Sequence, residues 1–135
     1  MPFRPVEGKV KSIFLPKTAS QAMTKGACVE ITSAKIDLCD DNDTQILGVI
    51  DQTIASTDSD YSSTKRVKVV VPCERLVLWE ATGQSGFSAS DVGGEFGIQS
   101  SLLLDQTDTT NKVFMVKEFV DAATVRGFLK INGSY

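Results

Sequence analysis

Residues Ala27-Cys-Val-Glu-Ile-Thr-Ser-Ala-Lys-Ile-Asp-Leu-Cys39 decide the fold class of this chain. Apolar and polar side chains alternate on either side of the central Thr-Ser-Ala, and a period of two residues is typical of a half-buried β-strand. Val29 and Ile31 share one face of the first run, while Ile36 and Leu38 share one face of the second. The short polar spacer between the two runs predicts a β-hairpin.

The register of this hairpin follows from its apolar faces, which must fall on the same side of the sheet. The predicted pairs are Thr32–Lys35, Ile31–Ile36 and Val29–Leu38. The same register places Cys28 opposite Cys39 on the other face. A disulfide between directly opposed strand positions is conceivable, but a reducing cytoplasm opposes it, so we expect two neighbouring free thiols. The third cysteine, Cys73, fits a small buried side chain.

Short runs rich in Val, Ile and Phe, separated by polar turns, continue along nearly the whole chain. No window shows a sustained helical period, and residues 90–96 alone suggest a single helical turn or a β-turn. We therefore expect an all-β fold, a small antiparallel barrel or sandwich built from hairpins, with at most one short helical turn. The 135 residues fit a single β domain, 1–135, in which residues 1–15 are a candidate N-terminal arm.

Several segments of this pattern carry a local expectation. The run from Val6 to Leu15 predicts one strand with a bulge or bend at Gly8, because glycine inside a strand marks such points. Gly48 suggests a bulge or a close approach of two backbones for the same reason. Ala55–Thr64 is rich in Ser, Thr and Asp and predicts a mobile surface loop.

Composition restricts the function classes open to this chain. It contains no histidine, which removes the Ser–His and Cys–His nucleophile schemes and most zinc sites. The net charge of −3 and the single short basic cluster at Lys65–Lys68 do not form the basic patch of a nucleic-acid binder. No apolar run is long enough to span a membrane, and the N-terminus lacks a signal-peptide core. We expect synthesis in the cytoplasm, with no nucleic acid or membrane as partner.

The acidic residues Asp37, Asp40, Asp41 and Asp43 form the best metal candidate in the sequence. Their spacing does not match an EF-hand loop, whose glycine and terminal glutamate are absent. Short Asp and Asn clusters are common in turns because their side chains bond to nearby backbone. We favour turn chemistry and predict no metal or cofactor.

Paired carboxylates for glycoside cleavage have four candidates, Glu74, Glu80, Glu95 and Glu118. Each lies at a strand or turn position where a solvated surface charge is expected, and the reaction needs two carboxyl groups at a defined separation. Without a recognisable acid–base constellation, we predict no catalytic residues and no enzyme activity.

Three segments, Lys25–Val29, Ile46–Ile50 and Val67–Val69, carry a family resemblance. Their order, a KGxxV strand, a hairpin, an xxGV strand and a VxV strand, resembles the small decoration (cement) proteins of tailed-bacteriophage capsids, which are β-barrel or β-tulip domains. Further segments that look like phage structural proteins are Ser90–Gly93, Lys112–Val116 and Val125–Phe128. The resemblance covers most of the chain.

The resemblance implies a structural virion protein on the capsid exterior. Such proteins commonly sit as homotrimers at threefold positions, where they bridge major capsid protein subunits and stiffen the shell. It implies the major capsid protein and further copies of this chain as partners. Two alternatives stay open: another head or tail component such as a connector, and a cytoplasmic β-barrel ligand-binding module.

The candidate partner-contact residues lie at the N-terminus and are Pro2, Phe3, Arg4, Pro5 and Val6. A proline-rich, partly apolar start is suited to adding a strand to the sheet edge of a neighbour. The alternative is an ordinary first strand within the domain's own sheet.

Overall fold

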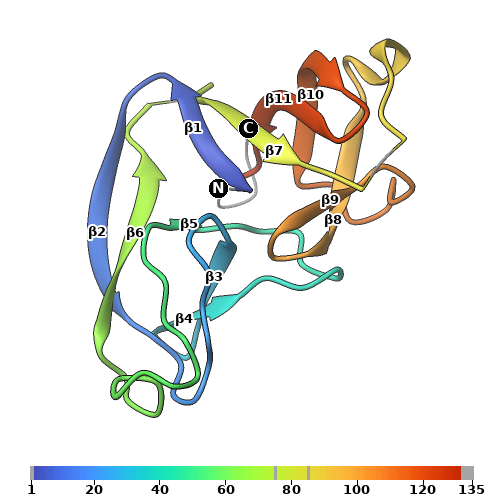
Figure 1. The fold of residues 1–135 in the computed structure, drawn as a ribbon. Helices are drawn as coiled ribbons and strands as arrows, with labels where there is room; N and C mark the ends of the chain where they lie inside the picture. Colours follow the sequence, from blue (N-terminus) through green and yellow to red (C-terminus); the bar gives the residue numbers. More distant parts are fainter. Residues whose placement is uncertain (1, 75, 85, 132–135) are drawn as a thin grey trace.

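The structure is a computed structural model and describes residues 2–74, 76–84 and 86–131. Within these residues the chain forms two antiparallel sheets, here called sheet A and sheet B, and one short 3-10 helix, η1 (Ala89–Asp91) (Figure 1). The prediction of an all-β, sandwich-like fold is confirmed. The helical turn expected near residue 90 corresponds to η1.

Sheet A holds both the N-terminal strand and the last third of the chain, and sheet B holds most of the first half. The strands of sheet A, in spatial order, are β1 (Phe3–Glu7), β7 (Leu78–Thr82), β11 (Thr124–Leu129), β10 (Phe114–Asp121), β8 (Glu95–Ser100) and β9 (Leu103–Asp105). Those of sheet B are β2 (Val10–Pro16), β6 (Arg66–Pro72), β5 (Gly48–Ile50), β3 (Cys28–Thr32) and β4 (Lys35–Leu38).

The predicted hairpin is the pair β3 and β4, and its register is confirmed at each predicted pair. The observed partners include Thr32–Lys35, Ile31–Ile36 and Val29–Leu38. One residue beyond β4, the N–H of Cys39 donates to the carbonyl of Cys28 over 3.0 Å. Both cysteines are buried and free. Cys73 is exposed, so its predicted burial is wrong; it lies beyond the end of β6, where the alternation no longer directs it inward.

The N-terminal run is two strands and not one. Gly8, with φ of 104°, forms the turn between β1 and β2. This left-handed conformation is accessible to glycine without a steric penalty. Because the two strands belong to different sheets, residues 3–16 contribute an edge strand to each sheet and join the two.

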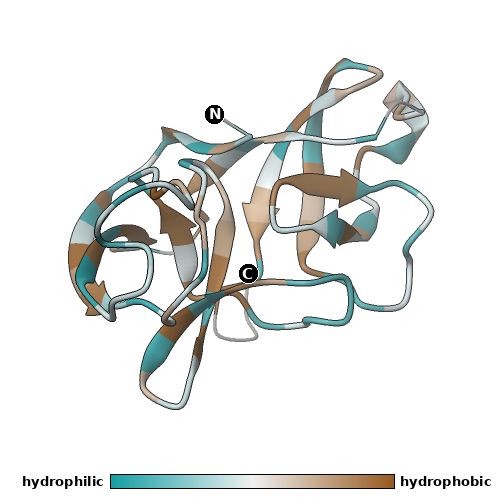
Figure 2. Cartoon of the chain, turned by 60° about the horizontal axis from the view of Figure 1, so that its bottom comes forward, coloured by the Kyte–Doolittle hydropathy of each residue, from teal (hydrophilic) through white to brown (hydrophobic). Residues whose placement is uncertain are grey.

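The hydrophobic core has two parts, and sheet B lies between them. The first part contains side chains of sheet A and side chains from the face of sheet B that packs against them. The second part lies on the opposite face of sheet B. In β6, Val67, Val69 and Val71 face the second part, as expected for alternate residues of a strand, while Val70 faces the first. Figure 2 shows that hydrophobic residues lie mainly in the strands and hydrophilic residues mainly in the connecting loops.

Close packing of β5 against β6 depends on Gly48, as the sequence suggested. A Cβ placed there would overlap the carbonyl oxygen of Val70 and lie 2.9 Å from Cγ1 of Val71. Real Cβ atoms do not approach other atoms so closely, so a larger residue would push the two strands apart. The glycine therefore permits the tightly packed centre of sheet B.

Each sheet curls until its two sides meet at one point. In sheet B, a parallel bridge joins Lys17, just after β2, to Ile36 in β4. In sheet A, a parallel bridge joins Gly83, just after β7, to Leu104 in β9. A single bridge does not close a sheet into a barrel. The two sheets are therefore open but strongly curved (Figure 1).

The bridge in sheet B is held by a buried lysine. The side chain of Lys17 is fully buried, and its Nζ donates to the carbonyls of Thr18 (3.0 Å), Gln21 (3.4 Å) and Tyr61 (2.7 Å). It also lies 5.8 Å from the centre of the Tyr61 ring. Burial lowers the pKa of Lys17, and the charge of Asp60 partly offsets this effect. The loop predicted to be mobile is thus anchored at Tyr61.

We expect Lys17→Met to lower the free energy of unfolding by about 1–3 kcal/mol, since three carbonyls of half-buried residues would lose their donor. The matched control is Lys65→Met, because Lys65 pairs with Asp60 at 2.7 Å in a partly exposed position. Such pairs contribute less than about 1 kcal/mol. Urea denaturation of both variants measures the difference, and equal losses would contradict a clamping role for Lys17.

Candidate functional site

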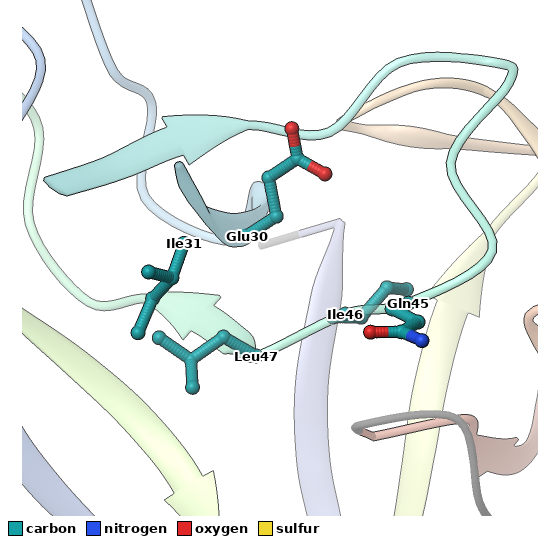
Figure 3. A pocket seen from close by; sticks show the side chains of 5 residues that line it. All are labelled: Glu30, Ile31, Gln45, Ile46 and Leu47. Carbon is teal, nitrogen blue, oxygen red and sulfur yellow. The ribbon is translucent and has the colours of Figure 1, made fainter. Parts of the chain in front are cut away.

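Two hollows and one side-chain cluster stand out among the described residues. The first hollow, of about 130 Å³, lies beside the β3–β4 hairpin. Its lining residues are Glu30, Ile31, Gln45, Ile46 and Leu47. In Figure 3 the side chains of Ile31 and Leu47 lie on one side of this hollow, and the carboxyl group of Glu30 points away from them, toward the end of β4.

The carboxyl group of Glu30 belongs to a cluster with Cys39 and Asp43. One ligand atom from each residue, two carboxylate oxygens and the Cys39 sulfur, lies within 4.8 Å of the others. The alternation of β3 and β4 places Glu30 and Cys28 on one face together with Cys39, which follows β4. Asp43 reaches them from the turn after β4, where its Oδ2 accepts a hydrogen bond from the N–H of Asp40 over 2.6 Å.

The predicted turn chemistry of the acidic residues is confirmed for Asp40 and Asp43. Oδ1 of Asp40 accepts a hydrogen bond from the N–H of Asn42 over 2.9 Å. Asp37 is held separately, because the side-chain amide of Gln21 donates to its Oδ1 over 2.5 Å. Of the four aspartates singled out in the sequence, Asp43 is the one that the structure places within 4.8 Å of both Glu30 and Cys39.

Burial dominates the electrostatics of this cluster. Burial raises the pKa of Glu30 to about 7, and the hydrogen bond and negative charge of Asp43 add to the rise, while the hydroxyl of Thr32 partly opposes it. Burial also raises the pKa of both Cys39 and Cys28. Because the thiolate is the nucleophile, thiols kept protonated by burial are poor nucleophiles at neutral pH.

The second hollow, of about 280 Å³, lies on the outer side of sheet A. Its lining residues are Glu7, Gly8, Glu74, Leu76, Leu78, Lys117, Glu118 and Phe128. Leu76 is 61% exposed and has φ of 62°, a left-handed conformation that is rare for a residue with a branched apolar side chain. The hollow therefore combines an exposed apolar side chain, a strained backbone and a mostly acidic rim.

A row of ion pairs crosses the four strands next to this hollow. Nη2 of Arg4 lies 2.9 Å from Oε1 of Glu80, and Nε of Arg126 lies 3.0 Å from its Oε2. Arg126 also approaches Glu118 at 3.9 Å. The row follows the strand register, since Arg4 and Arg126 are the partners of Glu80 on its two sides and Glu118 is the next partner of Arg126.

The charge state of Glu80 follows from this row. Burial acts to raise the pKa of Glu80, but the hydrogen bonds and charges of Arg126 and Arg4 outweigh it, so the pKa lies below its ordinary value. A carboxyl group that acts as a general acid near neutral pH needs a raised pKa. Glu74 is also engaged, because its Oε1 accepts a hydrogen bond from the N–H of Lys9 over 2.9 Å. These glutamates form structural contacts of strand and turn.

The structure places the predicted partner-contact residues in β1 and just before it. Phe3 is fully buried in the core, and its N–H donates to the carbonyl of Gly26 over 3.1 Å. Arg4 belongs to the ion-pair row, and Val6 is 37% exposed. Pro5 lacks an N–H and therefore interrupts the donors that an added strand would need. The partner-contact role stays a prediction, and Arg4 and Val6 are the members best placed for it.

Sequence reasoning missed Leu76, Arg126 and the role of Glu30. Nothing in the residues around Leu76 signals a left-handed backbone, and Arg126 acquires its partner through pairing between β7 and β11, which are distant in sequence. Glu30 carried a usable signal, because the alternation of the hairpin had already placed it on the same face as Cys28.

No family model matches the chain, and neither a curated protein nor a solved structure shows a significant match to it. Among the described residues, no helix has the length and hydropathy needed to cross a membrane. Inferences about function therefore depend on the residues and the surfaces described above.

We expect Glu80→Gln to reduce the free energy of unfolding at pH 7 by about 1–2 kcal/mol, because a charged acceptor for two arginines is lost. A lowered pKa contributes stability above the unfolded-state value, and this contribution is lost as the pH falls through the folded-state value. The difference from the parent protein should therefore disappear in acid. Glu95→Gln is the control, since Glu95 forms no salt bridge with a described residue. Thermal melts from pH 3 to pH 8 measure both variants, and a difference that does not shrink as the pH falls would contradict this account.

Proposed function

We propose that this chain is a structural virion protein that binds the outside of a tailed-bacteriophage capsid and bridges major capsid protein subunits. In this proposal it acts as a homotrimer and without catalysis. The family resemblance of the KGxxV, xxGV and VxV strands suggests the role. The observation that carries it in the structure is the exposed, strained Leu76 at the rim of the hollow on sheet A.

This side of sheet A has the composition of a protein-binding surface. The exposed Leu76 and the partly buried Phe128 supply apolar area, and Arg4 and Arg126 lie nearby in the ion-pair row. Aromatic side chains and arginine are enriched in protein interfaces. A non-glycine residue held in a left-handed conformation costs roughly 1–3 kcal/mol, and such strain clusters at binding sites.

The rigidity of this surface favours binding to a repeated lattice. Glu80 fixes the guanidinium groups of Arg4 and Arg126, so less side-chain freedom is lost when a partner docks. A standard interface buries about 800 Å² on each partner. Where subunits bind a lattice through several sites, modest individual affinities combine into stable attachment.

The two hollows described above are small for ligand pockets. They measure about 130 and 280 Å³, below the roughly 300–1,000 Å³ of small-molecule sites. Neither of these hollows therefore supports the alternative of a ligand-binding module. A connector or another head or tail component would bind a different partner from the major capsid protein. The binding experiment below therefore distinguishes this alternative from the capsid role.

The direct test is cosedimentation with expanded, DNA-free capsids assembled from the major capsid protein encoded nearest to this chain. We expect saturable binding in a fixed ratio to capsid subunits, and a trimer mass by light scattering. A protein that stays in the supernatant at all capsid concentrations would refute the proposal. Binding confined to isolated portal or tail complexes would instead support the connector alternative.

A substitution at Leu76 tests the surface itself. We expect Leu76→Asn to weaken capsid binding about tenfold, which corresponds to about 1.4 kcal/mol. Asparagine tolerates the left-handed conformation, so stability should be equal or higher. The control is Phe14→Thr, which removes an exposed apolar side chain, 55% accessible, from sheet B. An equal loss of capsid affinity in both variants, or no loss in Leu76→Asn, would contradict the proposal that this surface binds the capsid.

A further inference from the structure

We propose that Glu30, Cys39 and Asp43 bind one divalent transition-metal ion of the zinc class. The proposal is independent of the capsid role, because the cluster lies at the end of the β3–β4 hairpin and shares no residue with the hollow on sheet A. Three different ligand groups, one thiol and two carboxylates, converge within 4.8 Å.

The first observation behind this proposal is a pair of acids that lacks a cationic partner among the described residues. Glu30 and Asp43 are half-buried, and a carboxylate oxygen of each lies within 4.8 Å of one of the other. Their hydrogen bonds come from neutral groups, the Thr32 hydroxyl at 3.3 Å from Oε1 of Glu30 and the N–H of Asp40 at 2.6 Å from Oδ2 of Asp43. Over the part of the chain that the structure describes, no salt bridge reaches either carboxylate. Two carboxylates in contact disfavour each other's ionisation, and a bound cation would relieve that repulsion directly.

The second observation is the state of Cys39. Its side chain is 4% exposed and has no hydrogen-bond partner among the described residues, yet its sulfur lies beside both carboxylates. Free cysteine packs as a small apolar side chain, and Cys39 is part of the hydrophobic core beside Cys28. What sets its sulfur apart is its position beside two carboxylate oxygens, where one metal ion would contact all three groups.

The donor set selects the class of ion. Calcium and magnesium take oxygen ligands and would not recruit a thiol. Zinc and ions of similar character accept thiolate together with carboxylate. Ligand atoms around tetrahedral zinc lie about 3–4 Å apart, so small side-chain rotations of Glu30 and Asp43 would complete the contacts. Three protein ligands leave the fourth position of a tetrahedral zinc ion to water.

Binding would tie together three parts of sheet B. Glu30 lies in β3, Cys39 follows β4, and Asp43 belongs to the turn that leads toward β5. The Cys39 thiol releases its proton to the buffer when the metal–sulfur bond forms. Because the unfolded chain does not hold these ligands together, the ion should bind the folded state preferentially and stabilise it.

Titration of the full chain with Co²⁺ tests the proposal, because thiolate-bound cobalt gives a charge-transfer band in the near ultraviolet. We expect this band to saturate at one ion per chain, and Zn²⁺ to abolish it by displacement. We also expect Zn²⁺ at about 100 times its dissociation constant to raise the melting temperature by roughly 5–10 °C.

Two pairs of variants locate the site. Cys39→Ser should abolish the band, whereas Cys73→Ser, which removes the exposed cysteine, should leave it unchanged. Asp43→Asn should weaken binding at least tenfold, whereas Asp41→Asn makes the same charge change at an exposed position of the same turn and should not. If Cys39→Ser does not fold, the metal affinities of Asp43→Asn and Asp41→Asn still test whether the ion binds at this cluster.

Three results would overturn the proposal. One is the absence of a charge-transfer band at millimolar Co²⁺ in the reduced protein. Another is a band that is lost in Cys73→Ser and retained in Cys39→Ser, which would assign it to the exposed cysteine. The third is equal affinity in Asp43→Asn and Asp41→Asn, which would remove Asp43 from the ligand set.

Discussion

Burial of the central strands of sheet B on both faces is the constraint on which the rest of the structure depends. In β6, Val70 packs toward sheet A while Val67, Val69 and Val71 pack the other way. Each buried valine contributes roughly 1.5–3 kcal/mol relative to an exposed one. Because sheet B contributes side chains to both parts of the core, neither sheet can be displaced without exposing side chains of the other.

The double burial explains the polar features that surround it. A small sheet that curls around its own core brings its edge backbone groups into low-dielectric surroundings, where each needs a partner. Lys17 donates to the carbonyls of Thr18, Gln21 and Tyr61, which lie in the connecting segments beside the point where the two sides of sheet B meet. In sheet A, at the corresponding meeting point between Gly83 and Leu104, the N–H of Gln84 donates to the carbonyl of Leu104 over 3.0 Å. The buried lysine is therefore part of the closure of sheet B.

The curvature also separates two surfaces with different chemistry. The outer side of sheet A presents a row of ion pairs beside the exposed side chain of Leu76, a combination suited to docking against another protein. The end of the β3–β4 hairpin instead collects a thiol and two carboxylates near a small hollow. The first surface depends on strands from both ends of the chain, and the second on a local hairpin and the turn that follows it.

The sequence by itself determined the strand class, the register of the β3–β4 hairpin and the common face of Cys28, Glu30 and Cys39. These features follow from a period of two residues and from short-range pairing, which residues 27–39 encode locally. Tertiary structure alone decided the division of residues 3–16 between two sheets, the burial of Lys17 and the pairing of Arg126 with Glu80. The physical reason is that these features depend on contacts between segments far apart in the chain, and alternation specifies which face a residue occupies but not which strand will lie beside it.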